Sequence, residues 1–238
     1  GETAFTLLDT PGHVDFSSEM ERTLQVLDCA VLVVSGTDGI QGHTRTLWRL
    51  LERHQIPTFL FLNKMDLAGA DRDALLAQLR EKLDGGCLDF SGGLGPILED
   101  LAASDEELLD KYLEWGEVTW EEAASLVARR LVFPCFFGSA LKLEGVEALL
   151  EGLTRYSPIP EFGPEFGAKV FKIARDGADR LTYVKVTGGS LKVRTPLEGA
   201  DWQEKVNQIR VYSGSRYQTL EEAPAGTVCA LTGLTRTR

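Results

Sequence analysis

The run Asp9–His13 combines residue types that can handle a phosphorylated ligand. It follows the apolar segment Ala4–Leu8, which we expect to form a buried strand, so Asp9 would lie at the carboxyl end of that strand. A carboxylate in this place can hold a water molecule of Mg²⁺. Gly12 lets the backbone N–H approach a phosphate closely, and His13 adds a polar side chain ahead of a predicted helix. An ordinary turn between a strand and a helix is the alternative explanation.

A second polar group consists of Asn63, Lys64 and Asp66, which follow a predicted strand at 58–62. The Asp66 carboxylate can accept hydrogen bonds from N1–H and the N2 amino group of guanine, a donor pair that adenine lacks. Lys64 can cover a base or ribose with its apolar stem, and Asn63 can tie neighbouring loops together. Taken alone, this N-K-x-D pattern is weak, and a surface loop after a strand explains it better.

Small residues form the third group, Gly138, Ser139 and Ala140, at the end of a predicted strand at 132–137. They would let the backbone contact the edge of a base, although a Gly-Ser turn is a sufficient explanation when the group is taken alone. All three groups lie at the carboxyl ends of predicted parallel strands, which is where ligands bind in open α/β sheets. Together they predict one nucleotide site.

The elements that would position these groups alternate along the first part of the chain. Apolar runs predict strands, and amphipathic patterns between them predict helices, so we expect a parallel sheet covered on both faces. An acidic helical insert is expected at 98–130, with capping boxes that begin at Ser104 and Thr119. An acidic surface of this kind is usually a solvated face. The predicted strands are 4–8, 30–35, 58–62 and 132–137, and the predicted helices are 17–28, 44–54, 71–83 and 144–155.

Charge divides the chain into two parts. Residues 1–162 carry a net charge of −15, whereas residues 163–238 carry +4. Between them lies a Pro/Gly-rich stretch that is typical of a linker. The later part shows short strands broken by Gly, Pro and Asp, with a tight turn at Gly188 and Gly189, which fits a small β-barrel. We therefore predict an α/β domain at 1–157, a linker at 158–166 and a barrel at 167–238.

Composition excludes several classes of protein. The net charge of −11 argues against a basic nucleic-acid coat, and 43% hydrophobic residues are ample for a packed core. No apolar run reaches the roughly 18 residues of a membrane-spanning helix. The four cysteines form no C-x-x-C pair, so a disulfide framework is not expected. We expect a cytoplasmic protein without membrane or DNA partners.

The three groups together resemble the nucleotide motifs of translational GTPases. The word DTPGHVDF at Asp9–Phe16 is similar to elongation factor G and the tetracycline-resistance ribosomal protection proteins, and the similarity continues through nearly the whole chain. The resemblance implies a P-loop-NTPase-like G domain, truncated at its N-terminus, and a translation-factor β-barrel that is incomplete at the C-terminus. The compact insert is closer to the ribosomal protection proteins. Further similar runs are Asn63–Asp66, Leu109–Leu113, Gly138–Lys142, Phe171–Ile173 and Arg180–Tyr183.

The resemblance also implies roles for single residues. Asp9 would contact Mg²⁺ through water, Gly12 would donate its N–H to the γ-phosphate, and His13 would position the attacking water. The barrel would dock on ribosomal RNA, and the ligands would be GTP or GDP with Mg²⁺ in a protein whose partner is the ribosome. The residues that would read guanine are Asn63, Lys64, Asp66, Ser139, Ala140 and Leu141.

Two elements of that family have no match in the sequence. No Gly-Lys-Ser or Gly-Lys-Thr of a phosphate loop occurs, and the first switch with its Mg²⁺-binding threonine is also unmatched. We expect both to precede Ala4, so that these residues belong to a longer GTPase and are by themselves inactive and free of nucleotide. A non-catalytic module that binds the ribosome or RNA is the main alternative. An enzyme acting on adenine nucleotides or metabolites is a third, and the choice between translocation and tetracycline protection stays open.

Overall fold

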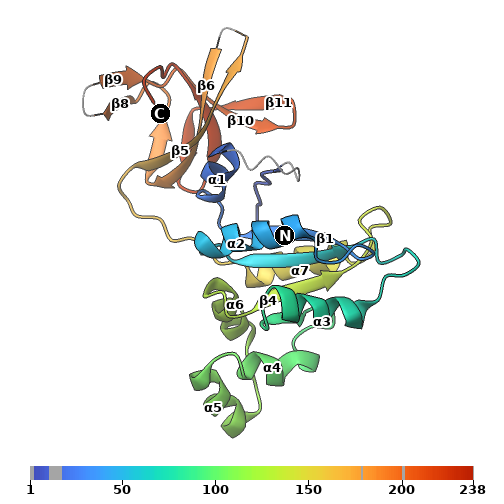
Figure 1. Ribbon diagram of the computed structural model, residues 1–238. Coiled ribbons are helices and arrows are strands. Elements are labelled where there is room, and N and C mark those ends of the chain that lie inside the picture. The colour runs from blue at the N-terminus through green and yellow to red at the C-terminus, as the bar shows by residue number, and fades with distance from the viewer. Residues whose placement is uncertain (1–2, 11–17, 178, 200–201, 238) are drawn as a thin grey trace. The chain divides into compact units, whose positions relative to one another are not determined.

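The computed structural model of the chain describes residues 3–10, 18–177, 179–199 and 202–237. It forms two compact units, Leu27–Ile159 and a second unit that joins Gly1–Val26 to Pro160–Arg238 (Figure 1). The change from one unit to the other after Ile159 falls inside the stretch predicted as a linker. The domain limits themselves stay a prediction.

The first unit, Leu27–Ile159, is built on a parallel four-stranded sheet of order β1-β2-β4-β3. Its two central strands are buried along most of their length and rich in Phe and Leu, as expected for strands with helices on both faces. The strands are β1 (Ala30–Ser35), β2 (Thr58–Asn63), β3 (Cys87–Asp89) and β4 (Phe133–Phe137). The helices are α2 (Gly42–Arg53), α3 (Arg72–Lys82), α4 (Leu98–Ala102), α5 (Glu106–Trp115), α6 (Trp120–Ala128) and α7 (Val146–Tyr156), with a 3₁₀ turn at Gly95–Ile97.

Successive residues of β2 divide the core between the two faces of the sheet, because strand side chains alternate. Phe59 and Phe61 pack with the residues of α4 to α7, including Leu126 of α6. Leu60 and Leu62 pack instead with Trp48 of α2 and with residues of α3. The predicted architecture, a parallel sheet with helices on both faces, is therefore confirmed (Figure 1).

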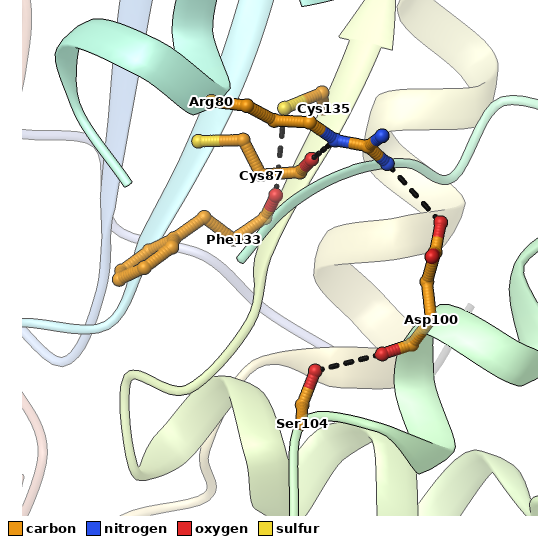
Figure 2. Close-up of polar contacts among 6 residues, drawn as sticks. All are labelled: Arg80, Cys87, Asp100, Ser104, Phe133 and Cys135. Atoms are coloured by element: carbon orange, nitrogen blue, oxygen red, sulfur yellow. Dashed lines mark hydrogen bonds and ion pairs between the residues drawn. The ribbon is translucent and has the colours of Figure 1, made fainter. Parts of the chain in front are cut away.

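Arg80 of α3 joins three elements of this unit (Figure 2). Its Nε donates to the carbonyl oxygen of Cys87 in β3 at 2.9 Å, and its Nη2 donates to Asp100 Oδ2 in α4 at 3.1 Å. Asp100 in turn accepts at its carbonyl oxygen from the Ser104 hydroxyl at 2.9 Å. A planar guanidinium can serve several acceptors at once, so one side chain holds the short edge strand and the start of the acidic insert together.

The segment Ala4–Leu8 is not a strand, contrary to our prediction. Phe5 is 51% exposed and Leu7 is 87% exposed. A strand is stabilised by hydrogen bonds to a neighbour, and none of the described strands pairs with this segment. Strand β1 lies at an edge of the sheet, paired on one side with β2, and within the described residues its other edge has no partner.

The second unit carries antiparallel sheets. The main sheet has the order β11-β10-β13-β6-β5, and two-stranded sheets are formed by β12 with β7 and by β8 with β9. The predicted β-rich region after the linker is thus confirmed as an all-β region. Its strands are β5 (Gly167–Asp176), β6 (Asp179–Gly188), β7 (Ser190–Lys192), β8 (Pro196–Gly199), β9 (Trp202–Lys205), β10 (Gln208–Ser213), β11 (Arg216–Leu220), β12 (Glu222–Pro224) and β13 (Val228–Thr232).

Helix α1 (Ser18–Leu24) belongs to this second unit and packs against β5. Two lysines of the strands hold the chain that follows it. Lys169 Nζ donates to the carbonyl oxygen of Gln25 at 3.4 Å, and Lys185 Nζ donates to that of Val26 at 3.0 Å. Within the described residues, no helix combines the length and apolar character needed to cross a membrane.

The two predicted helix caps differ in outcome. Thr119 forms the expected capping box with Glu122, because its hydroxyl accepts from the Glu122 N–H and the Glu122 carboxylate accepts from the Thr119 N–H. The cap predicted at Ser104 was wrong by one residue. Asp105 is the N-cap of α5 and accepts from the Leu108 N–H at 3.1 Å. A carboxylate is as good an N-cap as a hydroxyl, so the local sequence offered two adjacent candidates.

Candidate functional site

Two loops meet at the carboxyl ends of the neighbouring strands β2 and β4. The strands run in parallel with Leu62 beside Phe137, so the loops that follow start side by side. The Gly138 N–H donates to the Leu62 carbonyl oxygen at 3.0 Å, and the Met65 N–H donates to the Gly138 carbonyl oxygen at 3.0 Å. These two backbone bonds fix the loop after β2 against the loop after β4.

Asn63 provides a third connection through its side chain. Its Oδ1 accepts from the Lys64 N–H and from the Ala140 N–H, both at 2.8 Å. The backbone of Lys64 has φ of 65°, a left-handed conformation that turns the chain sharply after the strand. Asn63 therefore ties the two loops together, as its amide type suggested.

Asp66 lies where the two loops face each other. Lys142 Nζ is 3.2 Å from Asp66 Oδ2, and the Asp66 side chain is only 14% exposed. The hydrogen bond from the Ser139 hydroxyl, and next to it the Lys142 ammonium, lower the pKa of Asp66 below its ordinary value, because both stabilise the ionised form. The carboxylate is thus charged at neutral pH and held by donors from the neighbouring loop.

The loop after β4 is closed by its own backbone bonds. Ser139 and Glu144 exchange two hydrogen bonds of 3.0 Å, so the residues between them form a tight turn. Glycine is required on both sides of it. A Cβ on Gly138 would lie 2.0 Å from the Glu144 carbonyl oxygen, and one on Gly145 would lie 2.2 Å from the Phe137 carbonyl oxygen. The position of Ser139 relative to Asp66 is therefore set by the backbone.

Gly36, which follows β1, supports the same corner. The only feature of the sequence that could have indicated this role is its position after a strand. The Gly36 N–H donates to the Asn63 carbonyl oxygen at 2.7 Å. A Cβ at Gly36 would come within 2.8 Å of Met65 Sδ and 3.0 Å of that same carbonyl oxygen.

Sequence reasoning also placed Lys142 in a motif without giving it a role. Its ion pair to Asp66 emerges only from the folded loop.

The structure brings Asn63, Lys64, Asp66, Ser139 and Ala140 together at one corner of the sheet. Leu141 follows Ala140 on the same turn and is 92% exposed. The remaining residues of the predicted site are Asp9, which lies in the second unit and is exposed, and Gly12 and His13, which are outside the described residues.

The chemistry of this corner is that of an acceptor for paired donors. An ionised carboxylate offers two acceptor oxygens, and here the Ser139 hydroxyl and the Lys142 ammonium orient it. A planar ligand edge with two adjacent N–H donors matches it. No group of three or more His, Cys, Asp or Glu side chains that could hold a metal ion occurs among the residues the structure describes.

Two protein families match successive parts of the chain. Residues 1–159 match the family described as the elongation factor Tu GTP binding domain. Residues 165–238 match elongation factor G domain 2. The chain belongs to the translational GTPase family. The first match covers the whole parallel-sheet unit, so a guanine nucleotide is the ligand that this part of the translational GTPase implies.

A solved structure supports the same assignment for both parts. The translational GTPase chain is 29% identical to a protein from Thermus thermophilus whose crystal structure superposes with a TM-score of 0.81. The similarity covers 94% of this chain and 41% of that protein. The chain thus spans less than half the length of the solved structure that it matches.

Proposed function

We propose that the corner formed by the loops after β2 and β4 binds the guanine base in a ribosome-dependent GTPase. The observation that carries the proposal is the oriented Asp66 carboxylate, held by Ser139 and Lys142 beside loops that Asn63 ties together. Asp66 would accept from N1–H and the N2 amino group, the Lys64 stem and Leu141 would cover the faces of the base, and the Ala140 region would contact its edge.

The family resemblance supports a proposal for the phosphate end of the nucleotide. Asp9 would hold Mg²⁺ through water, the Gly12 N–H would donate to the γ-phosphate, and His13 would position the attacking water. One carboxylate is enough for this arrangement, since Mg²⁺ is commonly held by one or two carboxylates together with substrate phosphates and water. When bound, the ion would offset the negative charge of the phosphates.

A phosphate loop is needed for tight binding and for hydrolysis. The 238 residues contain no Gly-Lys-Ser or Gly-Lys-Thr. We propose that the loop and the first switch come from another segment of a longer polypeptide, which fits the partial coverage of the Thermus thermophilus protein. Hydrolysis would then change the conformation of the switch segments on the ribosome.

The barrel unit would provide contacts to ribosomal RNA. Residues 163–238 carry a net charge of +4, in contrast to the acidic remainder. Three basic side chains, Arg22, Lys172 and Arg180, line one pocket of about 400 Å³ in this unit, together with apolar residues of β5. A basic concave surface suits a phosphodiester backbone, and its binding should weaken as salt is added.

The test of this function is ribosome-stimulated GTP hydrolysis by the full-length gene product, with and without His13→Ala. We expect the variant to keep GTP affinity within a few-fold and to lose roughly 10²- to 10⁴-fold in stimulated turnover, the range for a group that positions water or a proton. Equal loss of binding and turnover would make His13 a structural turn residue. Rescue of translation in the presence of tetracycline would separate a protection factor from a translocase.

The second candidate is a non-catalytic module that binds the ribosome or RNA. The absence of a phosphate-loop motif from these residues is the observation that favours it. A full-length gene product that binds ribosomes but neither binds nor hydrolyses GTP would establish this function in place of the first.

A further inference from the structure

The side chain of Lys142 occupies a place that the proposed guanine site needs. Its Nζ lies 3.2 Å from Asp66 Oδ2, whereas the base would have to use both carboxylate oxygens for its two donors. The other donor to Asp66, the Ser139 hydroxyl, belongs to a residue that is only 2% exposed. Because Ser139 is buried on a turn closed by its backbone bonds to Glu144, its hydroxyl stays in place when a ligand binds.

Lys142 is free to move in a way that Ser139 is not. Its side chain is 52% exposed. The backbone of its turn is held by the Lys142 N–H donating to the Ser139 carbonyl oxygen at 3.1 Å, so only the flexible stem would have to change rotamer. An exposed ion pair of this kind contributes little free energy and is exchanged readily for another partner.

We propose that Lys142 occupies the base-binding carboxylate in the nucleotide-free protein and is exchanged for the guanine edge on binding. The proposal rests on the function proposed above. Because the ion pair must be broken first, Lys142 lowers the affinity for guanine. Lys142 also reduces the discrimination between guanine and purines that lack the N2 amino group. Such a purine can bind one Asp66 oxygen through N1–H alone while Lys142 stays on Oδ2.

The pKa of the Asp66 carboxyl provides an independent check on the ion pair. Lys142 is the second-largest cause of the lowered pKa of Asp66, after the Ser139 hydroxyl. Replacing the ammonium by an uncharged group should therefore raise that pKa toward its ordinary value. The titration of the Asp66 side chain can be followed by carbon NMR in the absence of any ligand.

The variant is Lys142→Met, which keeps the length of the stem and removes its charge. The matched control is Arg129→Met, which breaks a comparable ion pair in the acidic insert. There Arg129 Nη2 lies 2.6 Å from Asp105 Oδ2, with side-chain exposures of 55% and 16%. The probes are guanosine and inosine, neutral nucleosides that differ only by the N2 amino group and make no phosphate contacts. Binding to the 238-residue chain is measured by NMR titration of the amides of Asn63, Asp66 and Ala140.

We expect Lys142→Met to bind guanosine about two- to fivefold more tightly and inosine with unchanged affinity, while Arg129→Met matches the parent for both. Raising KCl from about 50 to about 500 mM should strengthen guanosine binding by the parent about two- to threefold and leave Lys142→Met unaffected, because salt screens the ion pair but not a neutral ligand.

The outcomes separate this proposal from the one on which it rests. If the parent binds guanosine at these amides but Lys142→Met binds it equally or more weakly, the exchange is wrong and the guanine site stands. If guanosine and inosine both tighten together, Lys142 blocks the site without selecting the base, which also overturns the proposal. If the parent shows no shift at these amides with either nucleoside, the guanine site itself is wrong.

Discussion

At the scale of single residues, Asn63 has the most consequential position in the candidate site. One side-chain oxygen accepts two backbone N–H groups, one from its own loop and one from the loop 77 positions later in the chain. Each of these donors would lack a protein partner if the amide were removed. The geometry of the corner therefore depends on a residue that need not touch a ligand.

Truncation of that side chain should loosen the corner. We expect Asn63→Ala to destabilise the parallel-sheet unit by about 2 kcal/mol, since two hydrogen bonds of roughly 1 kcal/mol each are lost. Chemical denaturation followed by tryptophan fluorescence measures the change, and hydrogen exchange at the Ala140 amide should become faster. Asn63→Asp keeps the accepting oxygen and serves as the control. Unchanged protection of Ala140 in the alanine variant would contradict the role of Asn63 as a tie.

In the proposed guanine site, the choice of base depends on Asp66. In the full-length protein, Asp66→Asn should weaken GTP binding by about 10²-fold and favour xanthosine triphosphate by comparison. The reason is that an amide N–H₂ can donate to the carbonyl that xanthine carries in place of the guanine amino group. Competition binding with the two nucleotides measures the switch, and Asp73→Asn, at an exposed position of α3, is the control. Unchanged GTP affinity in Asp66→Asn would remove this loop from the base site.

At the scale of elements, the start of α6 shows how one side chain can stabilise two helices. Glu122 completes the capping box with Thr119 and also binds Lys111 of α5, with Nζ 2.5 Å from Oε1. The Lys111 ammonium first, and the Thr119 N–H next, lower the pKa of the Glu122 carboxyl below its ordinary value of 4.5. The acidic insert thus keeps its helices together through charges of opposite sign.

The lowered pKa gives this contribution a pH dependence. A carboxyl whose pKa is depressed by folding stabilises the folded state above its unfolded pKa and loses that effect as pH falls through the folded value. Glu122→Gln should therefore cost about 0.5 kcal/mol of unfolding free energy at pH 7, and the difference from the parent should disappear as pH falls below about 4.5. Denaturation at several pH values measures it, with the neighbouring exposed Glu121→Gln as control. A difference that stays constant down to pH 3 would exclude the ion pair as its cause.

The elements that could be predicted from sequence were those with a complete local pattern. The strands β1, β2 and β4 are continuous apolar runs, and they were found within a residue or two of their limits. Strand β3 was missed because three residues, Cys87–Asp89, are too few to show a pattern. Ala4–Leu8 has the composition of a strand but no neighbour to pair with among the described strands. The composition of a segment describes that segment alone, whereas a strand also needs a neighbouring strand with which to form hydrogen bonds.

Some residues of the candidate site could likewise be predicted from sequence, whereas others could not. The motif residues Asn63, Asp66, Ser139 and Ala140 were visible because their types and their places after strands were both informative. The contribution of Lys142 depends on the path of a closed turn, and that of Gly36 depends on the distance to Met65. Local sequence encodes neither the position of Lys142 beside Asp66 nor the distance from Gly36 to Met65, because both follow from the register of β1, β2 and β4.

At the scale of the whole molecule, the 238 residues contain the proposed base site but no phosphate-loop motif. The corner at Asp66 can contribute a few hydrogen bonds, whereas most of the affinity for a nucleotide comes from charge-assisted bonds to phosphate. Losing three such bonds at roughly 2 kcal/mol each corresponds to a loss of about 10⁴ in affinity.

Calorimetry on this chain should therefore show no tight GDP binding in the presence of Mg²⁺. Guanosine and GDP should bind with affinities within about tenfold of each other, since the sequence has no phosphate-loop motif to bind the phosphates of GDP. A sub-micromolar dissociation constant for GDP would mean that the phosphate loop is dispensable or is replaced by residues not recognised as such in the sequence.

The outer edge of β1 is an unpaired strand edge among the described residues, and its consequence concerns contacts between copies of the chain. Val31 and Val33 are 37% and 59% exposed, and within the described residues no strand pairs along this edge. A β-branched strand edge offers a ladder of N–H and C=O groups that a second copy can complete by pairing its own strand there. Neither Pro nor a charge interrupts Ala30–Ser35, so nothing in the strand opposes such pairing. Because pairing of two copies depends on the square of the protein concentration, dilution will favour the separate copies.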